Sequence, residues 1–191
     1  MIIYDITQEL FSTTIYPGDP IPTKKSWLSI ENGDICNLTI LSLGSHSGTH
    51  IDAPKHFIAE GKDVAELSLD KCIGYCEVIY CNGRITSEFL AKTLEEGTDK
   101  ILLRGNVILD EEFAKSIVKC KINLIGVEMP TVGDEVSQKQ VHKILLENEV
   151  VILENLNLDK IPEGKYFLVA QPLKMDDVDG SPVRALLIVD K

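Results

Sequence analysis

One stretch of the sequence decides which fold and site to expect: residues 46–57, which read HSGTHIDAPKHF. The stretch includes Asp52 and three of the four histidines of the 191-residue chain, namely His46, His50 and His56. A glycine and a proline within it disfavour a helix. In an extended chain alternate side chains share one face, so we expect His46, His50 and Asp52 to point the same way. Pro54 then turns the chain and returns His56 to the same place.

This grouping has the composition of a catalytic metal site. Two imidazoles and one carboxylate form a three-ligand set for Zn²⁺ or a similar divalent ion, with a fourth position left for water. His56 lies off that face but close to it, and an imidazole with an ordinary pKa near 6.5 is suited to move a proton. The alternative from the residues alone is a set of core or surface histidines that cluster by chance.

The rest of the chain predicts a mixed α/β fold. Runs rich in β-branched residues recur along its whole length and predict strands. These runs are Ile2–Ile6, Leu38–Leu43, Cys76–Tyr80, Ile101–Leu103, Ile122–Val127, Val150–Leu153, Tyr166–Ala170 and Ala185–Val189. No internal repeat, linker or change of composition divides the chain, so we predict one domain over residues 1–191.

Three helices are predicted between these strands. The first follows Thr86, whose hydroxyl can cap the free amides of the first turn, and ends at Gly97. The second begins at Asp110, where acidic groups meet the positive end of the helix dipole. The third begins at Ser137, which with Gln140 has the form of a capping box, and runs to about Glu147.

Composition narrows the classes of function. The formal net charge of −11 disfavours nucleic acid and anionic membrane surfaces as partners. The apolar runs are far shorter than the roughly 20 residues of a membrane-spanning helix, and the first residues lack the pattern of a secretory signal. Five cysteines without a C-x-x-C pair fit reduced core thiols, although Cys72 and Cys76 are an alternative metal pair. We therefore expect a cytoplasmic protein that acts on a small molecule.

The stretch at 46–57 resembles the H-x-G-T-H-x-D-x-P-x-H signature of the cyclase-like metal-dependent hydrolases, the family of bacterial kynurenine formamidase and isatin hydrolase. The resemblance extends along nearly the whole chain. Further segments that look like landmarks of the family are Tyr16–Pro20, Val141–Lys143, Glu154–Leu156 and Asp179–Ala185.

The resemblance implies more than the spacing does. It implies a swivelling β/β/α fold, with a strand-rich core and outer helices, and a homodimer or homotetramer. It implies two divalent ions, which we expect to be Zn²⁺, with Mn²⁺ as the alternative. His46, His50 and Asp52 would hold one ion, His142 and Glu154 the other, with Asp52 bridging and His56 as general acid and base. Taken without the resemblance, His142 reads as a helix-surface residue and Glu154 as a solvated strand end.

Three positions bear on the substrate. Tyr16 stands where the formamidases of the family carry a tryptophan that stacks on the substrate ring; a tyrosine can stack too, or simply pack against its own turn. Arg104-Gly105-Asn106 replaces a longer pocket-covering loop, and Glu128 replaces the family's usual aspartate. We expect both departures to affect the substrate side of the site.

These features predict a divalent-metal hydrolase of carbon-nitrogen amide bonds, and within that class an arylformamidase of tryptophan catabolism that converts N-formyl-L-kynurenine into L-kynurenine and formate. One alternative is a hydrolase of a cyclic amide or lactone, like isatin hydrolase, or a cyclase of another small carbonyl compound. The other is a metal-binding protein without catalysis, although a purely structural metal site would normally be closed by four protein ligands.

Overall fold

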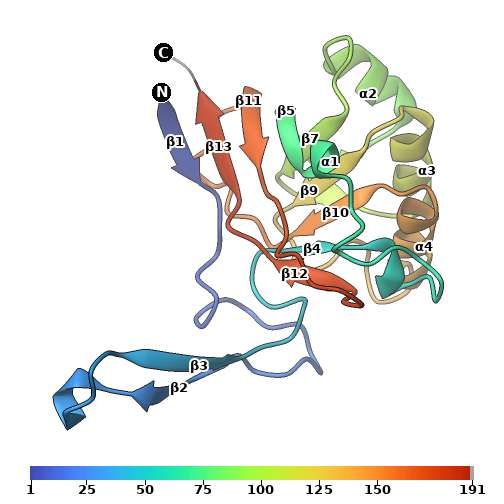
Figure 1. Cartoon of the computed structure of the whole chain (residues 1–191). Helices are drawn as coiled ribbons and strands as arrows, with labels where there is room; N and C mark the ends of the chain where they lie inside the picture. The colour runs from blue at the N-terminus through green and yellow to red at the C-terminus, as the bar shows by residue number, and fades with distance from the viewer. Residues whose placement is uncertain (190–191) are drawn as a thin grey trace.

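The computed structural model describes residues 1–189, and its main feature is a mixed sheet of nine strands within that range (Figure 1). In sheet order the strands are β1 (Ile2–Asp5), β13 (Leu186–Val189), β11 (Gly164–Val169), β5 (Ile73–Tyr80), β7 (Lys100–Arg104), β9 (Leu124–Val127), β10 (Val151–Glu154), β4 (His50–Asp52) and β12 (Gly180–Pro182). The helices are α1 (Leu69–Cys72), α2 (Ser87–Thr93), α3 (Glu111–Lys119) and α4 (Gln138–Glu147), with 3-10 turns at Ile30–Asn32 and Pro54–His56.

The centre of the sheet is parallel and both of its ends are antiparallel. β5, β7, β9 and β10 run in parallel, and α2, α3 and α4 connect successive strands across one face. Antiparallel pairing adds β11, β13 and β1 at one end and β4 and β12 at the other. A strand overlaps each of the eight predicted runs, so the predicted α/β pattern is confirmed.

Side-chain alternation in the central strands builds two cores. Ile101 and Leu103 face the helices and pack with Phe113 of α3 and Leu145 of α4. Leu102, between them, faces the opposite core. That second core collects residues from distant parts of the chain, among them Ile6, Ile51, Leu153, Tyr166 and Leu187, as the sheet curls around it.

All three predicted helix starts are confirmed, but only the first two are capped as expected. The hydroxyl of Thr86 and the carboxylate of Asp110 accept the amides of Phe89 and Phe113, as N-caps do. Ser137 makes no such bond, because the carboxylate of Asp134 accepts the Ser137 amide and hydroxyl instead. The first helix also stops at Thr93, four residues before Gly97, which occupies a later turn with φ of 88°.

A two-stranded hairpin extends away from the body of the molecule (Figure 1). It consists of β2 (Thr23–Leu28) and β3 (Leu38–Ser42), which pair with each other in a sheet of their own. The polar sequence of β2 did not predict a strand. The hairpin carries exposed apolar side chains, with Trp27 62% and Ile35 96% exposed. Cys36 is also exposed here, so the prediction that all the cysteines are core residues is wrong for Cys36, whereas Cys72 and Cys76 are buried.

Within residues 1–189, no helix has both the length and the apolar character needed to cross a membrane.

Candidate metal centre

The histidine-rich stretch folds into β4 and the two turns that flank it. His50 and Asp52 lie two residues apart on β4, so their side chains share a face as predicted. His46 is not on an extended strand: residues 45–49 form a turn, and Gly48 has a φ of 68°. The turn nevertheless brings Nδ1 of His46 to 2.8 Å from Oδ1 of Asp52.

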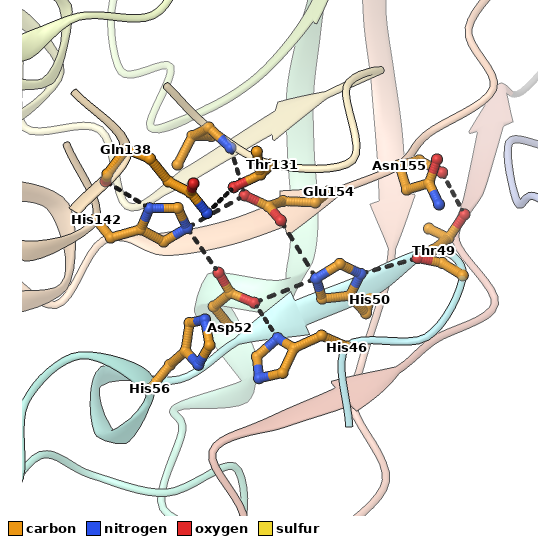
Figure 2. A network of polar contacts seen from close by, with 12 residues as sticks. His46, Thr49, His50, Asp52, His56, Thr131, Gln138, His142, Glu154 and Asn155 are labelled. Carbon is orange, nitrogen blue, oxygen red and sulfur yellow. Dashed lines mark hydrogen bonds and ion pairs between the residues drawn. The ribbon is translucent and has the colours of Figure 1, made fainter. Parts of the chain in front are cut away.

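The turn after Pro54 returns His56 to the same place. Pro54–His56 is a single 3-10 turn in which the His56 amide donates to the Ala53 carbonyl. The ring of His56 then lies 3.9 Å from the ring of His46, measured between centroids. The structure therefore brings together all four residues that the stretch predicted (Figure 2).

Glu154 reaches the site through strand pairing. β10 is antiparallel to β4, and Glu154 stands directly opposite His50 in their register. Oε2 of Glu154 lies 3.3 Å from Nε2 of His50, and its Oε1 accepts the amide of Val132 at 2.7 Å. The side chain of Glu154 is 3% exposed, so it is not the solvated strand end that its position in the sequence indicates.

His142 reaches the site from α4, which packs beside β10. Its Nδ1 lies 2.8 Å from the carbonyl of Gln138, one turn earlier, and its ring stacks on Phe57. Nε2 of His142 is 3.5 Å from Oδ2 of Asp52 and 3.5 Å from Oε1 of Glu154. The residue is 1% exposed, so it too is in the site and not on the helix surface.

Thr49 joins the two strands that carry these groups. Its hydroxyl donates to the carbonyl of Asn155 at 2.6 Å (Figure 2) and accepts the amide of Gln8 at 2.8 Å. Its own carbonyl accepts the amide of Val183. Thr49, which precedes His50, is therefore bonded to Asn155, which follows Glu154.

The nitrogens that face the carboxylates are ready to act as ligands. Nδ1 of His50 lies 2.8 Å from the Gly48 carbonyl, and Nδ1 of His142 lies 2.8 Å from the Gln138 carbonyl. A carbonyl only accepts, so Nδ1 carries the proton in both rings, and in the neutral ring Nε2 presents a lone pair. These lone pairs are directed at the oxygens of Asp52 and Glu154, which also have lone pairs to share. Divalent cations bound here would satisfy these four side chains.

The environment of Asp52 also indicates a cation site. The residue is completely buried, and Oδ2 has no hydrogen-bond partner among the residues that the structure describes. A buried carboxylate oxygen without a partner carries a large desolvation cost. Two groups offer ligand atoms that lie within 4.8 Å of one another: one contains His50, Asp52 and Glu154, and the other contains His46, Asp52 and His56. Asp52 belongs to both groups. Glu154 belongs to the group with His50 and also lies beside His142.

Electrostatics in the cluster favour positive charge. Burial by itself lowers the pKa of His50 and His142, but contacts with Asp52 and Glu154 outweigh it and raise both pKa values to about 10. Burial likewise raises the pKa of Asp52, but its three histidine neighbours hold it well below its usual range. Asp52 is therefore ionised at neutral pH and attracts either protons on the histidines or a metal ion.

Asp179 is a member of the cluster that the sequence did not single out. Its Oδ2 lies 2.9 Å from Nε2 of His46 and 3.1 Å from Nδ1 of His56, and its Oδ1 accepts the hydroxyl of Ser45 at 2.9 Å. Hydrogen bonds from His46 and His56 hold the pKa of Asp179 far below its usual range. Its place in the Asp179–Ala185 segment was the available signal, but only the fold shows which histidines it meets.

Two cavities adjoin each other near the cluster, and the smaller one reaches it. The smaller, of about 180 Å³, is lined by His46, His50, His56, His142 and Glu154. The larger, of about 560 Å³, has a partly apolar wall that includes Val107, Ile108, Leu109 and Met129. Both are lined by Tyr16, Pro130, Thr131 and Gln138, so they adjoin.

The three positions expected to affect the substrate differ in where they lie relative to the two cavities. The hydroxyl of Tyr16 donates to Gln138 of α4 at 2.8 Å, so the tyrosine does more than pack against its own turn. Asn106 lines the larger cavity, as expected of the short segment after β7. Glu128 lines neither cavity; its carboxylate accepts the amides of Gly105 and Leu158. Glu128 therefore holds two loops together, and its expected effect on the substrate side of the site stays a prediction.

Comparison with known proteins shows which family the chain belongs to. Residues 4–134 match the family described as putative cyclase. A kynurenine formamidase of Bacillus thuringiensis (strain Al Hakam) is 36% identical over 201 residues, which cover 96% of this chain and 95% of the relative. The chain belongs to the cyclase family. The resemblance expected from the 46–57 stretch is thereby confirmed.

Solved structures agree with this assignment. The predicted metal-dependent hydrolase from Bacillus stearothermophilus superposes with a TM-score of 0.80 at 27% identity, and the match covers 97% of both chains. Isatin hydrolase A of Labrenzia aggregata has a TM-score of 0.83 at 22% identity, covering 100% of this chain and 94% of that one. The predicted cyclase-like α/β fold is therefore confirmed. The chain is an enzyme of this hydrolase family that uses divalent metal, and the His/Asp/Glu groups of the buried cluster are candidate ligands.

Proposed function

We propose that this enzyme is an arylformamidase, which hydrolyses N-formyl-L-kynurenine to L-kynurenine and formate. The observation that carries the proposal is the buried set of histidines and carboxylates beside the smaller of two adjoining cavities. The similarity of the chain to a kynurenine formamidase, over nearly the full length of both proteins, supports the choice of an amide substrate.

Two divalent ions fit the residues present. In this proposal His46, His50 and Asp52 hold one ion, and His142 and Glu154 hold the other with Asp52 shared. When bound, a divalent ion supplies a Lewis acid for the amide carbonyl and lowers the pKa of a bound water from 15.7 to about 7. Imidazole and carboxylate ligands suit Zn²⁺ first and also Mn²⁺. The unpartnered Oδ2 of Asp52 supports the shared position.

His56 is the proposed general acid and base. Its Nδ1 lies against Asp179, so Nε2 is the nitrogen available to the small cavity that the ring lines. His56 accepts a proton from the attacking water and delivers it to the amide nitrogen as the carbon-nitrogen bond breaks. The new carbon-oxygen bond leaves in formate, and the nitrogen leaves as the aromatic amine.

The cavities fit the two parts of this substrate. The small cavity, which reaches the histidines, has room for a formyl group, whereas the larger and partly apolar cavity has room for the aromatic ring and its side chain. Tyr16 lies where the two meet, at a place from which its ring can contact the aromatic ring of a substrate. We propose Tyr16 as a substrate-binding residue.

A turnover screen on metal-loaded protein tests the proposal. The panel is N-formyl-L-kynurenine, isatin and a simple lactone, each with Zn²⁺ and with Mn²⁺. We expect the formamide to have the highest kcat/KM and chelation to abolish its turnover. A clear preference for isatin or the lactone contradicts the arylformamidase proposal and favours the cyclic-amide or lactone hydrolase.

We also propose that the chain forms a homodimer or homotetramer through the hairpin of β2 and β3. An isolated two-stranded hairpin has marginal stability in water, and this one pairs with no further strand in the described structure. Exposed apolar side chains along it, including Trp27, Ile35 and Leu41, support contact with a second copy.

A further inference from the structure

We infer that Asp179 is a positioning residue, which sets the nitrogen that His46 presents to metal and the nitrogen that His56 presents to substrate. The part that concerns His56 rests on the proposed function, because it assumes that His56 exchanges a proton with a substrate. The part that concerns His46 requires only that the cluster binds metal.

One oxygen of Asp179 contacts both rings. Oδ2 is 2.9 Å from Nε2 of His46 and 3.1 Å from Nδ1 of His56, and a carboxylate oxygen has two lone pairs for two N–H donors. Oδ1 accepts the Ser45 hydroxyl at 2.9 Å, which fixes the rotation of the carboxylate. The two rings lie side by side, 3.9 Å apart and tilted by 32°, so one acceptor reaches both.

The contact decides how His46 can bind metal. Nδ1 of His46 faces Asp52 at 2.8 Å, and Nε2 faces Asp179 on the other side of the ring. Because Asp179 accepts the proton on Nε2, Nδ1 is the nitrogen that can give its lone pair to an ion beside Asp52. Carboxylates that orient a metal-binding histidine in this way typically change metal affinity by 10- to 100-fold.

The contact also decides which nitrogen of His56 is available. With Nδ1–H held by Asp179, the lone pair of Nε2 is free to accept a proton. Without the carboxylate either tautomer is open to a neutral imidazole, and the ring is free to turn. Asp179 therefore connects a proposed metal ligand and the proposed acid and base through one atom.

The backbone holds Asp179 in this place. Its carbonyl accepts the amide of Ala53, and the next residue, Gly180, stands opposite Asp52 in the pairing of β12 with β4. Gly180 lies so close to His46 that a Cβ there would be 2.5 Å from the Cε1 atom of the ring. Asp179 and Gly180 thus fix His46 by a hydrogen bond and by direct packing.

The test observes the histidine rings themselves. Only four histidines are present, so protein labelled with ¹⁵N-histidine and loaded with Zn²⁺ gives four ring systems in a long-range ¹H–¹⁵N spectrum. We expect the wild type to show the Nδ1–H tautomer for His56, and Asp179→Ala to lose it. Competition with a chelator should show a 10- to 100-fold loss of Zn²⁺ affinity in Asp179→Ala. On N-formyl-L-kynurenine, kcat should fall more than 100-fold with little change in KM.

Two variants distinguish a positioning role of Asp179 from a nonspecific loss of structure. Asp179→Asn keeps an acceptor for both rings, because the Ser45 hydroxyl can turn to accept from the amide, so it should retain the His56 tautomer and much of the Zn²⁺ affinity. Asp176→Ala removes an exposed aspartate three residues earlier and should match the wild type. Asp179→Ser, too short to reach both rings, replaces Asp179→Ala if the latter does not fold.

The inference is overturned if Asp179→Ala or Asp179→Ser has the same histidine spectrum and the same Zn²⁺ affinity as Asp176→Ala. Neither readout needs a substrate. A wild type that does not hydrolyse N-formyl-L-kynurenine therefore contradicts the proposed function and leaves the assignment of Asp179 to be decided by the spectrum and the chelator.

Discussion

Glu154 and His50 are direct partners in the register of β10 and β4, and Oε2 of one lies 3.3 Å from Nε2 of the other. They are 104 residues apart in the chain, yet strand pairing gives them a shared position at the centre of the cluster. Asp52, two residues beyond His50, contacts three histidines.

Glu154→Gln should weaken metal binding and preserve the fold. The amide oxygen can still accept the Val132 amide, which the carboxylate accepts at 2.7 Å, but the negative charge beside His50 and His142 is lost. We expect at least a 10-fold loss of Zn²⁺ affinity in chelator competition. Glu147→Gln, an exposed carboxylate at the end of α4, is the matched control. Equal affinities for the two variants would exclude Glu154 as a ligand.

His56→Ala and Asp52→Ala should fail in different ways. His56→Ala should keep its metal and lose turnover by about 10²- to 10⁴-fold, the usual contribution of a general acid and base. Asp52→Ala should lose the metal itself, because Asp52 belongs to both groups of candidate ligands. Metal content by elemental analysis and kcat on N-formyl-L-kynurenine measure the two effects. Wild-type turnover in both variants would show that the assignment is wrong.

Metal affinity should rise with pH. In the metal-free protein the carboxylates raise the pKa of His50 and His142 to about 10, and a ligand must lose its proton to bind metal. Apparent Zn²⁺ affinity should therefore increase from pH 6.5 to 8.5, with protons released on binding. The same shift stabilises the metal-free fold fully below pH 6.5, and this stabilisation is lost as the pH rises through about 10. Titration calorimetry in buffers of different ionisation enthalpy checks the proton release; none at any pH contradicts the prediction.

Gly180→Ala should displace His46. The added Cβ would lie 2.5 Å from Cε1 of that ring, so either the ring or β12 must move. Overpacking of this kind costs about 1–3 kcal/mol of folding stability. We expect a lower Tm and weaker Zn²⁺ binding together. Unchanged values of both would show that the ring adjusts freely and that its position is not held by β12.

Loss of apolar side chains on the hairpin should dissociate the assembly. The wild type should run as a dimer or tetramer in light scattering, and a variant that combines Trp27→Glu with Ile40→Lys should run as a monomer, because both side chains are exposed on the isolated hairpin. Val136→Glu changes an equally apolar and 94% exposed position on the body and should keep the assembly. A monomeric wild type contradicts the proposal directly.

Local sequence patterns were sufficient to predict much of the fold and half of the site residues. Strands such as β7 and β10 follow from short runs of β-branched residues, and the starts of α2 and α3 follow from capping by Thr86 and Asp110. The capping box at Ser137 failed because Asp134, three residues earlier, accepts both the amide and the hydroxyl of Ser137. The polar strand β2 has no local pattern of burial to reveal it, because it lies outside both cores.

The sequence by itself determined that His46, His50, Asp52 and His56 would meet. Alternation along β4 puts His50 and Asp52 on one face, and short turns on either side return His46 and His56 to it, all within a few residues. Only the tertiary structure decided the other half of the cluster. Glu154 depends on the register of β10 against β4, His142 on the packing of α4, and Asp179 on the pairing of β12. Each of these contacts joins segments far apart in the chain, and no local preference of the backbone encodes such a distance.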